Sequence, residues 1–247
     1  MVPSSPWWGE HRSRYHFAAR YARSGKVLDI ACGTGYGSRI LIDAGAELVV
    51  GMDLSPEALA EAAKEPKSGP IICRADATAI PLRTESVDLV TSFETIEHLT
   101  HDVEYLSELH RVLRPSGVLL LSTPNALRSN PTGGRPANPF HVREYRPEDL
   151  KRLLGKYFSE VSLLGQKTDP RFGFSPFWDD LSERPRGARS TLSVAAWLVA
   201  HRLPFALKDR TSRLRHNRPF YPGEYDFIFA PEFLRSAHVT VAVCRKG

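Results

Sequence analysis

The sequence of 247 residues is poor in cysteine and contains no cysteine motif for metal binding. Its three cysteines, Cys32, Cys73 and Cys244, lie in or beside apolar runs, and no C-x-x-C pair occurs. Cysteines in such runs are typical of small buried side chains in a reducing compartment. The missing C-x-x-C pair argues against a structural zinc site.

Long hydrophobic runs are also missing from the sequence. The longest strongly apolar stretch, around residues 192–200, is too short to cross a bilayer. The opening residues, MVPSSPWWGEHRSR, contain no apolar core of a signal peptide. We therefore expect a cytoplasmic protein without a membrane span.

The charge balance has no strong excess of either sign. The net charge is +5, the isoelectric point is about 9.2, and 42% hydrophobic with 25% charged residues is an ordinary composition for a globular chain. The mild positive excess fits an anionic ligand and is far below the charge density of a histone-like protein. The length suffices for one large domain or for a core domain with an insertion, and no internal repeat is visible.

The most informative segment is VLDIACGTGYGS, which reads as an apolar strand, a glycine-rich turn and the start of a helix. Asp29 lies at the strand end, and Gly33, Gly35 and Gly37 alternate after it. Glycines there let the backbone approach a ligand, and the amides that open the next helix favour a negative group. The dinucleotide fingerprint would require glycine at the position of Ser38. The turn alone therefore fits several nucleotides or an ordinary connection.

Two acids follow the next two predicted strands. Asp53 comes after the apolar strand 47–52 and before a helix start at Ser55, while Asp76 follows the strand 70–74. In a nucleotide-binding βαβ unit, an acid at the end of the second strand can accept hydrogen bonds from both ribose hydroxyls. Asp76 is open to two interpretations, a ligand contact or the cap of a turn or helix.

Strands and helices alternate along most of the chain with short connections, which predicts an α/β fold with a mostly parallel sheet. The fourth predicted strand is almost continuously apolar, as expected for a strand covered on both faces. The predicted strands are 26–31, 47–52, 70–74, 87–93, 118–122, 158–164 and 237–244, and the predicted helices are 10–22, 37–44, 147–156 and one that begins at Asp102 and ends before Arg114-Pro115-Ser116-Gly117.

Several segments together resemble the class I methyltransferases that depend on S-adenosylmethionine (SAM), in particular the broad group that includes the ubiquinone and menaquinone methyltransferases. The segments are LDIACGTG, VVGMDLS, CRADATAIPL, SVDLVTSFETIEHL and LRPSGVLLLSTPN, and the resemblance covers about residues 10–165. It implies a Rossmann-like, doubly wound sheet with an antiparallel last strand. The chain departs from the family's pattern at Ala31, which replaces the first glycine of the turn. We expect Ala31 to narrow the freedom of the turn without abolishing binding.

The resemblance implies a site for SAM at the carboxyl ends of the strands. Asp29, Gly33 and Gly35 would frame the methionine half. Asp53 would accept from the ribose and Asp76 from the exocyclic amine of adenine. Phe93, at the end of the fourth strand, would lie near the sulfonium. The complete set of expected cofactor-binding residues is Tyr15, Asp29, Ala31, Gly33, Gly35, Asp53, Leu54, Asp76, Ala77 and Phe93.

Two further segments distinguish the chain from a minimal domain of this kind. The connection 124–146 is rich in proline and glycine, and its end resembles bacterial methyltransferases associated with sugars, so we interpret it as an active-site lid. Residues 167–235 look inserted before the last strand and contain an apolar helix at 192–203, a basic run and many aromatic residues. Including an N-terminal arm and helix at 1–25, we expect one methyltransferase domain over 1–247. Its insertion would contact the acceptor or a second copy of the chain in a homodimer.

The acceptor is expected beside the end of the fourth strand, where Glu94, Glu97 and His98 follow. Histidine titrates near neutral pH, so His98 is our first choice of general base and His141, in the lid, our second. His98 also has a purely structural interpretation, and Glu97 could orient it, although adjacent residues of a helix do not face each other. Such a cluster could hold a divalent metal, but its spacing is not diagnostic and we expect none.

The sequence therefore favours a SAM-dependent O-methyltransferase that acts on a sugar-like, glycan-like or other small hydroxyl acceptor and releases S-adenosyl-L-homocysteine. Three alternatives stay open: methylation of a quinone or polyketide-like product, methylation of RNA, and a catalytically silent SAM-fold module that binds a partner. Against RNA, the sequence has no separate RNA-binding module, and its fourth strand ends in Phe-Glu rather than in an Asn/Asp-Pro-Pro-Tyr type of signature. The intact glycine turn and acids argue against a silent module.

Overall fold

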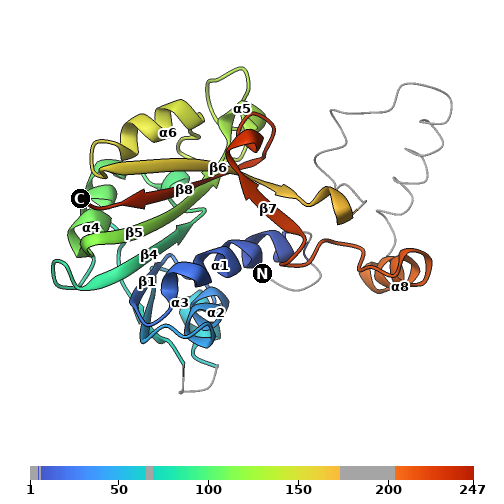
Figure 1. The fold of residues 1–247 in the computed structure, drawn as a ribbon, viewed down its shortest axis with the longest axis horizontal. Helices are drawn as coiled ribbons and strands as arrows, with labels where there is room; N and C mark the ends of the chain where they lie inside the picture. The colour runs from blue at the N-terminus through green and yellow to red at the C-terminus, as the bar shows by residue number, and fades with distance from the viewer. Residues whose placement is uncertain (1–4, 6, 65–68, 173–203) are drawn as a thin grey trace. The chain divides into compact units, whose positions relative to one another are not determined.

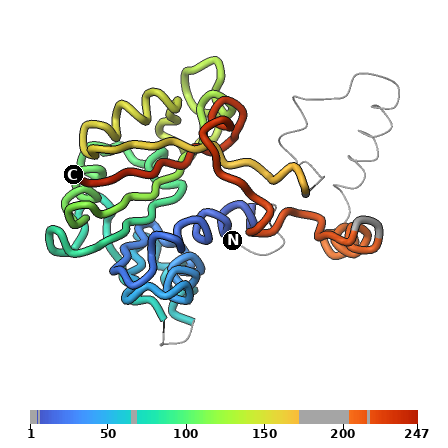
Figure 2. The backbone as a smooth tube through the Cα atoms, viewed as in Figure 1, coloured from blue at the N-terminus to red at the C-terminus, as the bar shows by residue number. Residues whose placement is uncertain are grey.

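The computed structural model describes residues 5, 7–64, 69–172 and 204–247, which form two compact units. The larger unit comprises residues 14–167 and 229–247, and the smaller unit comprises residues 1–13 and 168–228 (Figures 1 and 2). The predicted helix at 192–203 and several aromatic residues of the predicted insertion lie outside the described residues. Within the described ranges, no helix has the length and apolar character that crossing a membrane requires.

The described strands form one sheet in the order β3-β2-β1-β4-β5-β8-β6-β7 (Figure 1). The strands from β3 to β5 pair in parallel, whereas β8 runs antiparallel to both β5 and β6. This order confirms the predicted doubly wound, mostly parallel sheet with an antiparallel last strand. The strands are β1 (Lys26–Ile30), β2 (Leu48–Asp53), β3 (Ile71–Arg74), β4 (Val87–Phe93), β5 (Leu113–Pro124), β6 (Glu160–Thr168), β7 (Phe227–Ala230) and β8 (Val239–Arg245).

The sheet is covered on both faces. Successive side chains of its buried strands point to opposite sides and therefore pack into two different cores. In β1, Val27 belongs to the core that contains α1 and α2 residues, and Leu28 belongs to the core that contains α4 and α6 residues. The described helices are α1 (Trp8–Ala22), α2 (Tyr36–Asp43), α3 (Pro56–Ala62), α4 (Asp102–Val112), α5 (Ala126–Ser129), α6 (Pro147–Leu154) and α8 (Phe205–His216), with short 3₁₀ turns η1 (Ile96–His98), η2 (Pro170–Phe172) and η3 (Pro231–Phe233).

The fifth strand is longer than predicted. We expected Arg114-Pro115-Ser116-Gly117 to separate α4 from a strand beginning at Val118, but β5 already begins at Leu113, directly after α4. Leu113 pairs with Val87, and the register shifts between Val87 and Leu89. The residues at 114–117, which we expected to form a turn, therefore lie inside the strand as an irregularity, where Ser116 has a φ of 63°.

The smaller unit joins the start of the chain to the described part of the predicted insertion. Arg12 forms an ion pair with Glu224 at 3.2 Å, and Gly9 lies against the carbonyl oxygen of Pro222, where a Cβ would come within 2.1 Å. The predicted basic run 208–218 lies largely in α8. There Lys208 is buried over the Phe220 ring, and Arg213 pairs with Asp209 at 2.6 Å. Some charged side chains of this run therefore make contacts with neighbouring residues of the same unit.

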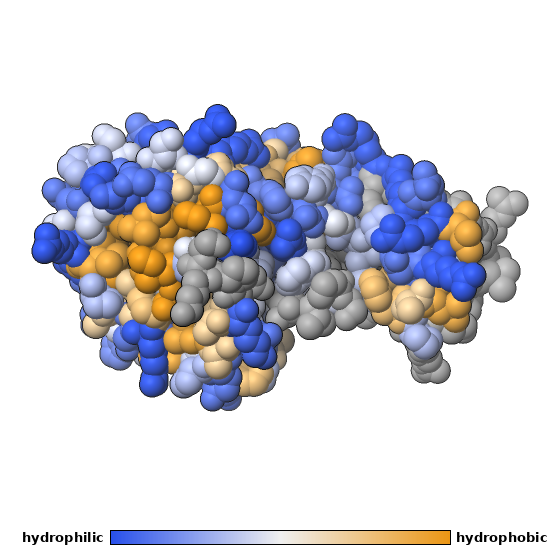
Figure 3. Space-filling view, turned by 90° about the horizontal axis from the view of Figure 1, so that it is seen from below, coloured by the Kyte–Doolittle hydropathy of each residue, from blue (hydrophilic) through white to orange (hydrophobic). Residues whose placement is uncertain are grey.

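Apolar side chains also reach the surface of the protein. Figure 3 shows one face on which orange, apolar residues gather among blue, polar ones. Leu54, which follows β2, and Ile71, the first residue of β3, are both more than half exposed. Leu54 lies beside the carboxyl end of its strand, a position compatible with a ligand that covers it, whereas Ile71 pairs with Val50 further back in the sheet.

Candidate active site

The glycine turn after β1 uses left-handed backbone conformations in quick succession. Ala31, Gly33 and Gly35 have φ values of 57°, 58° and 76°. Glycine adopts this region without steric cost, whereas a residue with a Cβ is disfavoured there by about 1–2 kcal/mol. The structure thus accounts for the family's glycine at position 31: Ala31 takes the same left-handed conformation at an energetic cost.

Asp53 holds the glycine turn from the neighbouring strand. Its Oδ2 accepts a hydrogen bond from the Gly33 amide at 2.7 Å, and its Oδ1 accepts from the Ser55 amide at 2.9 Å. Each carboxylate oxygen has a second lone pair, so both can still accept a ligand hydroxyl. The sequence predicted a ribose contact at Asp53 and did not predict this bond to the turn.

Asp29 is fully buried at the end of β1, where three hydroxyl groups converge on its carboxyl group. Tyr15 and Thr91 donate to Oδ1 at 3.1 and 2.8 Å, and Ser38 donates to Oδ2 at 2.6 Å. Burial raises the pKa of Asp29 to about 6, although the three hydrogen bonds oppose the shift. Asp29 therefore ties α1, α2 and β4 to the strand behind the turn, and its carboxyl group is not exposed to a ligand.

Tyr15 explains the third glycine of the motif. Gly37 does not adopt a left-handed conformation, but a Cβ on it would lie 2.0 Å from the Tyr15 ring. The ring also packs edge-on against Phe93, with centroids 4.9 Å apart. Burial, followed by the nearby Asp29, raises the pKa of Tyr15, so its hydroxyl stays protonated and donates. Tyr15 and Phe93, both predicted to bind the cofactor, thus form one buried aromatic contact beside the turn.

Asp76 forms a local turn after β3. Its Oδ1 accepts from both the amide and the hydroxyl of Thr78, at 2.8 and 2.7 Å. These hydrogen bonds, that of the amide foremost, lower the pKa of the Asp76 carboxyl group. The turn interpretation of Asp76 therefore holds. Its exposed position leaves the second carboxylate oxygen as the candidate for the predicted adenine contact, between the half-exposed neighbours Ala77 and Ala75.

Glu94 follows β4 in a left-handed conformation, with a φ of 53°. Its Oε1 accepts from the Ser122 hydroxyl at 2.7 Å and lies 3.2 Å from the Nη1 of Arg14. Arg14 is completely buried in α1, and it also donates to Gln166 at 2.7 Å. A non-glycine residue in this conformation at the end of a central strand is the kind of local strain that accumulates at functional sites. The sequence did not predict the pairing of Glu94 with Arg14.

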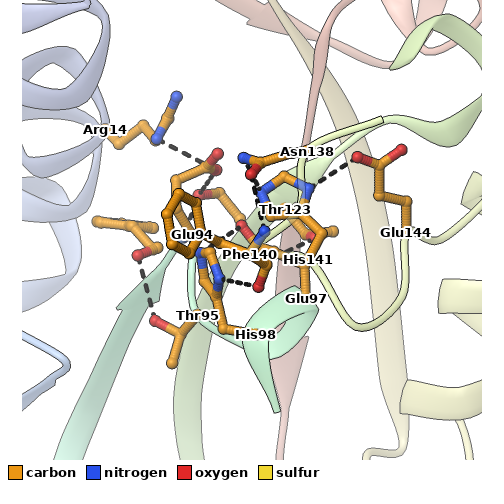
Figure 4. Close-up of polar contacts among 12 residues, drawn as sticks. Arg14, Glu94, Thr95, Glu97, His98, Thr123, Asn138, Phe140, His141 and Glu144 are labelled. Carbon is orange, nitrogen blue, oxygen red and sulfur yellow. Dashed lines mark hydrogen bonds and ion pairs between the residues drawn. The ribbon is translucent and has the colours of Figure 1, made fainter. Parts of the chain in front are cut away.

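Glu97, His98 and His141 meet next to this strand end (Figure 4). One ligand-capable atom of each lies within 4.8 Å of the others, and the two imidazole centroids are 4.9 Å apart. Glu97 and His98 belong to η1, whereas His141 comes from the predicted lid. The structure thus brings together the three residues that the sequence predicted as catalytic, although they come from two segments.

The end of the predicted lid is fastened to η1 and α4. The amides of Val142 and Arg143 both donate to the Glu97 carbonyl oxygen, at 2.8 and 3.2 Å. Arg143 and Tyr145 then bind the Asp102 carboxylate at 2.6 and 2.9 Å. The residues at 131–140 are mostly exposed. The position of His141 is therefore set by backbone bonds to the segment that carries its two partners.

Glu97 is a buried acid in an unusual environment. Its Oε2 accepts from Thr123 at 2.9 Å, while its Oε1 is buried and has no hydrogen-bond partner in the described part of the chain. Burial, reinforced by the nearby Glu94, raises the pKa of Glu97 to about 8. A buried carboxyl group with a raised pKa, directly beside two histidines, marks a candidate site for proton or cation chemistry.

The chain is similar to known methyltransferases over much of the larger unit. Residues 28–121 match the family described as a methyltransferase domain. The chain is 38% identical over 155 residues to a probable S-adenosylmethionine-dependent methyltransferase from Mycolicibacterium smegmatis, a match that covers 62% of the chain and 59% of that relative. It is 41% identical over 106 residues to a malonyl-[acyl-carrier protein] O-methyltransferase from Enterobacter lignolyticus, covering 43% of the chain and 40% of that protein.

A solved structure shows the same fold over nearly the whole chain. The S-adenosylmethionine-dependent methyltransferase from Mesorhizobium loti superposes with a TM-score of 0.57 at 18% identity, and the match covers 94% of this chain and 98% of that one. The chain spans about three fifths of the length of the Mycolicibacterium relative. The matched domain begins within β1, just before the glycine turn, and ends within β5. Residues 28–121 thus form a methyltransferase domain, and the chain is similar over that region to proteins named as S-adenosylmethionine-dependent methyltransferases.

Proposed function

We propose that the protein transfers a methyl group from SAM to a hydroxyl oxygen of a sugar-like, glycan-like or other small-molecule acceptor. The observation that carries the proposal is the meeting of Glu97, His98 and His141 beside the end of β4. An acceptor oxygen attacks the methyl carbon in line with the breaking C–S bond, whose electron pair stays on sulfur. A hydroxyl acceptor must also lose its proton, and this cluster supplies groups that can assist that loss.

On the donor side, we assign SAM to the glycine turn and the adjoining strand ends. The second lone pairs of the Asp53 oxygens suit the two ribose hydroxyls, and the Oδ2 of Asp76 suits the adenine amine. The exposed Leu54 side chain, next to Asp53, would pack against the adenosine. Asp29 and Tyr15 would act indirectly, because both are buried behind the turn.

On the acceptor side, polar residues of the lid favour a hydroxyl-rich molecule over a quinone. Asn138, His141 and Glu144 form a hydrogen-bonded chain there, with bonds of 2.9 and 2.7 Å. The Enterobacter relative is named an O-methyltransferase, which supports oxygen rather than nitrogen as the methylated atom. The free thiols of Cys32, Cys73 and Cys244 fit a reducing compartment, so we place the reaction in the cytoplasm.

The proposal is tested by incubating the full chain with SAM that carries a deuterated methyl group and with separate panels of saccharides, quinones and RNA. Mass spectrometry should detect the label on oxygen of a saccharide or small hydroxyl compound. His98→Ala should lower turnover by about 10²–10⁴-fold. The exposed His101, which lies outside the cluster, provides the control variant His101→Ala.

Other outcomes of this experiment would overturn the proposal. Label on nitrogen would contradict a hydroxyl acceptor, and label confined to RNA would favour the nucleic acid alternative. Binding of S-adenosyl-L-homocysteine without transfer to any panel would favour the silent module. Undiminished turnover in His98→Ala would remove His98 from the chemistry.

A further inference from the structure

We propose that Glu97, His98 and His141 together bind one divalent transition-metal ion. The use of this ion in catalysis rests on the proposed function, but its binding can be measured without any acceptor. Each of the three residues offers one ligand atom, and these atoms lie within 4.8 Å of one another. They converge from η1 and from the lid, as Figure 4 shows, so the site exists only when the two segments are folded together.

The His98 ring is oriented by a backbone contact with the lid. Its Nδ1 lies 2.9 Å from the Phe140 carbonyl oxygen, which can only accept a hydrogen bond. The proton of a neutral ring must therefore be on Nδ1, which leaves the lone pair of Nε2 available. That Nε2 lies 4.0 Å from the Glu97 Oε1. Histidines that bind metals commonly donate their other ring N–H to a carbonyl or carboxylate in this way.

The His141 ring has the same protonation pattern for an independent reason. Its Nδ1 lies 2.7 Å from the Glu144 carboxylate, and its Nε2 lies 2.9 Å from the Asn138 Nδ2. The Asn138 Oδ1 accepts from the Phe140 amide, so its Nδ2 must be the donor towards His141. Nδ1 of His141 is therefore the protonated atom, and its Nε2 holds a lone pair that an ion would take over from Asn138.

The third ligand is the buried carboxyl group beside the two rings. Glu97 has a completely buried side chain whose Oε1 has no hydrogen-bond partner among the residues that the structure describes, while Thr123 fixes its Oε2. Leaving such an oxygen unpartnered is costly, and a cation ligated by it removes that cost. Glu144 and Thr123 would then serve as the outer partners that orient two of the three ligands.

The cluster can close around an ion by small movements. Ligands about 2.1 Å from a tetrahedral ion lie roughly 3.4 Å from one another, so the present spread must contract. The His98 side chain is 41% exposed, so its ring can shift towards the buried Glu97 without displacing core residues. Two imidazoles and one carboxylate favour Mn²⁺, Fe²⁺, Co²⁺ or Zn²⁺ over Mg²⁺ or Ca²⁺, which prefer oxygen ligands.

The ion would change how the acceptor is activated. Three protein ligands leave positions open for an acceptor hydroxyl, and coordination lowers the pKa of a bound hydroxyl. Its proton passes to solvent, the oxygen attacks the methyl carbon, and the C–S bond breaks with its electron pair remaining on sulfur. The two histidines then act as ligands, in place of the general base predicted from sequence.

The test is a titration of the full-length, EDTA-treated and dialysed protein with Co²⁺. We expect one ion per chain and visible ligand-field bands that indicate nitrogen and oxygen ligation. His98→Ala, His141→Ala and Glu97→Gln should each weaken Co²⁺ binding by more than tenfold, and Glu144→Gln by about 10–100-fold. His101→Ala, which alters an exposed histidine outside the cluster, should bind like the wild type.

Binding of S-adenosyl-L-homocysteine to each variant, measured by calorimetry, reports whether the fold and the donor site are intact. Equal Co²⁺ affinity in the wild type and in His98→Ala, or no stoichiometric binding by a protein that still binds S-adenosyl-L-homocysteine, would overturn the metal site. If Co²⁺ binds as expected but no acceptor is methylated, the metal site stands and the proposed function fails. If transfer occurs in EDTA and is lost in His98→Ala, His98 is a base and the inference is wrong.

Discussion

At Asp29, a single buried carboxyl group receives hydroxyl donors from α1, α2 and β4. Burial raises its pKa from 3.8 to about 6, so the folded protein retains a proton that the unfolded chain releases. Between these pH values the folded state binds more protons, and stability therefore falls as the pH rises. The full benefit of the neutral group is present below about pH 4 and is lost above about pH 6.

We predict that Asp29→Asn removes this pH dependence. An amide can still accept from Tyr15 and Thr91, and the Ser38 hydroxyl can turn to accept from it. Between pH 4 and 6 the wild type should lose on the order of 3 kcal/mol of unfolding free energy relative to the variant. Urea unfolding at several pH values measures the difference, and parallel curves for the two proteins would contradict the account.

Gly37 has no room for a side chain beside the Tyr15 ring. Gly37→Ala places a methyl group 2.0 Å from the Tyr15 ring, which must move away from Asp29 and Phe93. We expect a loss of about 1–3 kcal/mol in unfolding free energy, as for other overpacked sites. Gly223→Ala, whose Cβ would lie an ordinary 3.6 Å from the Asp226 carboxylate, is the matched control. A thermal melt that shows equal effects at both positions would refute the packing role of Gly37.

Among the elements, α1 is held to the end of β4 by the ion pair of the buried Arg14 with Glu94, whose side chain is 21% exposed. Removing Arg14 leaves the Glu94 charge only partly solvated and without its partner, so we expect the lower end of the about 3–5 kcal/mol that breaking a buried ion pair costs. We therefore predict that Arg14→Met lowers the unfolding free energy by about 3 kcal/mol. Arg39→Met, which breaks the more exposed pair with Asp43, should cost less than about 1 kcal/mol. Similar losses in chemical denaturation of the two variants would disprove the role of the Arg14 pair.

The order of these elements could be predicted because each carries its own local pattern. Sequence neighbours alone determine the apolar runs of β1 and β4, and they also determine the helix start of α3 at Ser55-Pro56. The early start of β5 could not be predicted in the same way. Leu113 is held by its pairing with Val87, and that distant contact overrides the turn preference of the residues after it.

In the molecule as a whole, the sequence predicted which residues belong to the candidate site but not how they are arranged in space. The sequence marked Glu97, His98 and His141, yet His141 follows His98 by 43 residues, too far for a spacing rule to relate them. Their meeting depends on the Val142 and Arg143 amides binding the Glu97 carbonyl oxygen. The pairing of the buried Arg14 with Glu94 likewise comes only from a tertiary contact, whereas Glu144 supports His141 from three residues along the chain.

The donor site is the part of the whole protein on which every other assignment depends, and calorimetric titration with S-adenosyl-L-homocysteine tests it most directly. We predict one binding site per chain in the wild type. Asp53→Ala should weaken binding by at least about tenfold, because it removes both the proposed ribose acceptor and the bond to the Gly33 amide. Asp43→Ala, at the exposed end of α2, should leave the affinity unchanged. A wild-type protein that is folded but binds no S-adenosyl-L-homocysteine, or an Asp53→Ala variant with wild-type affinity, would contradict the account.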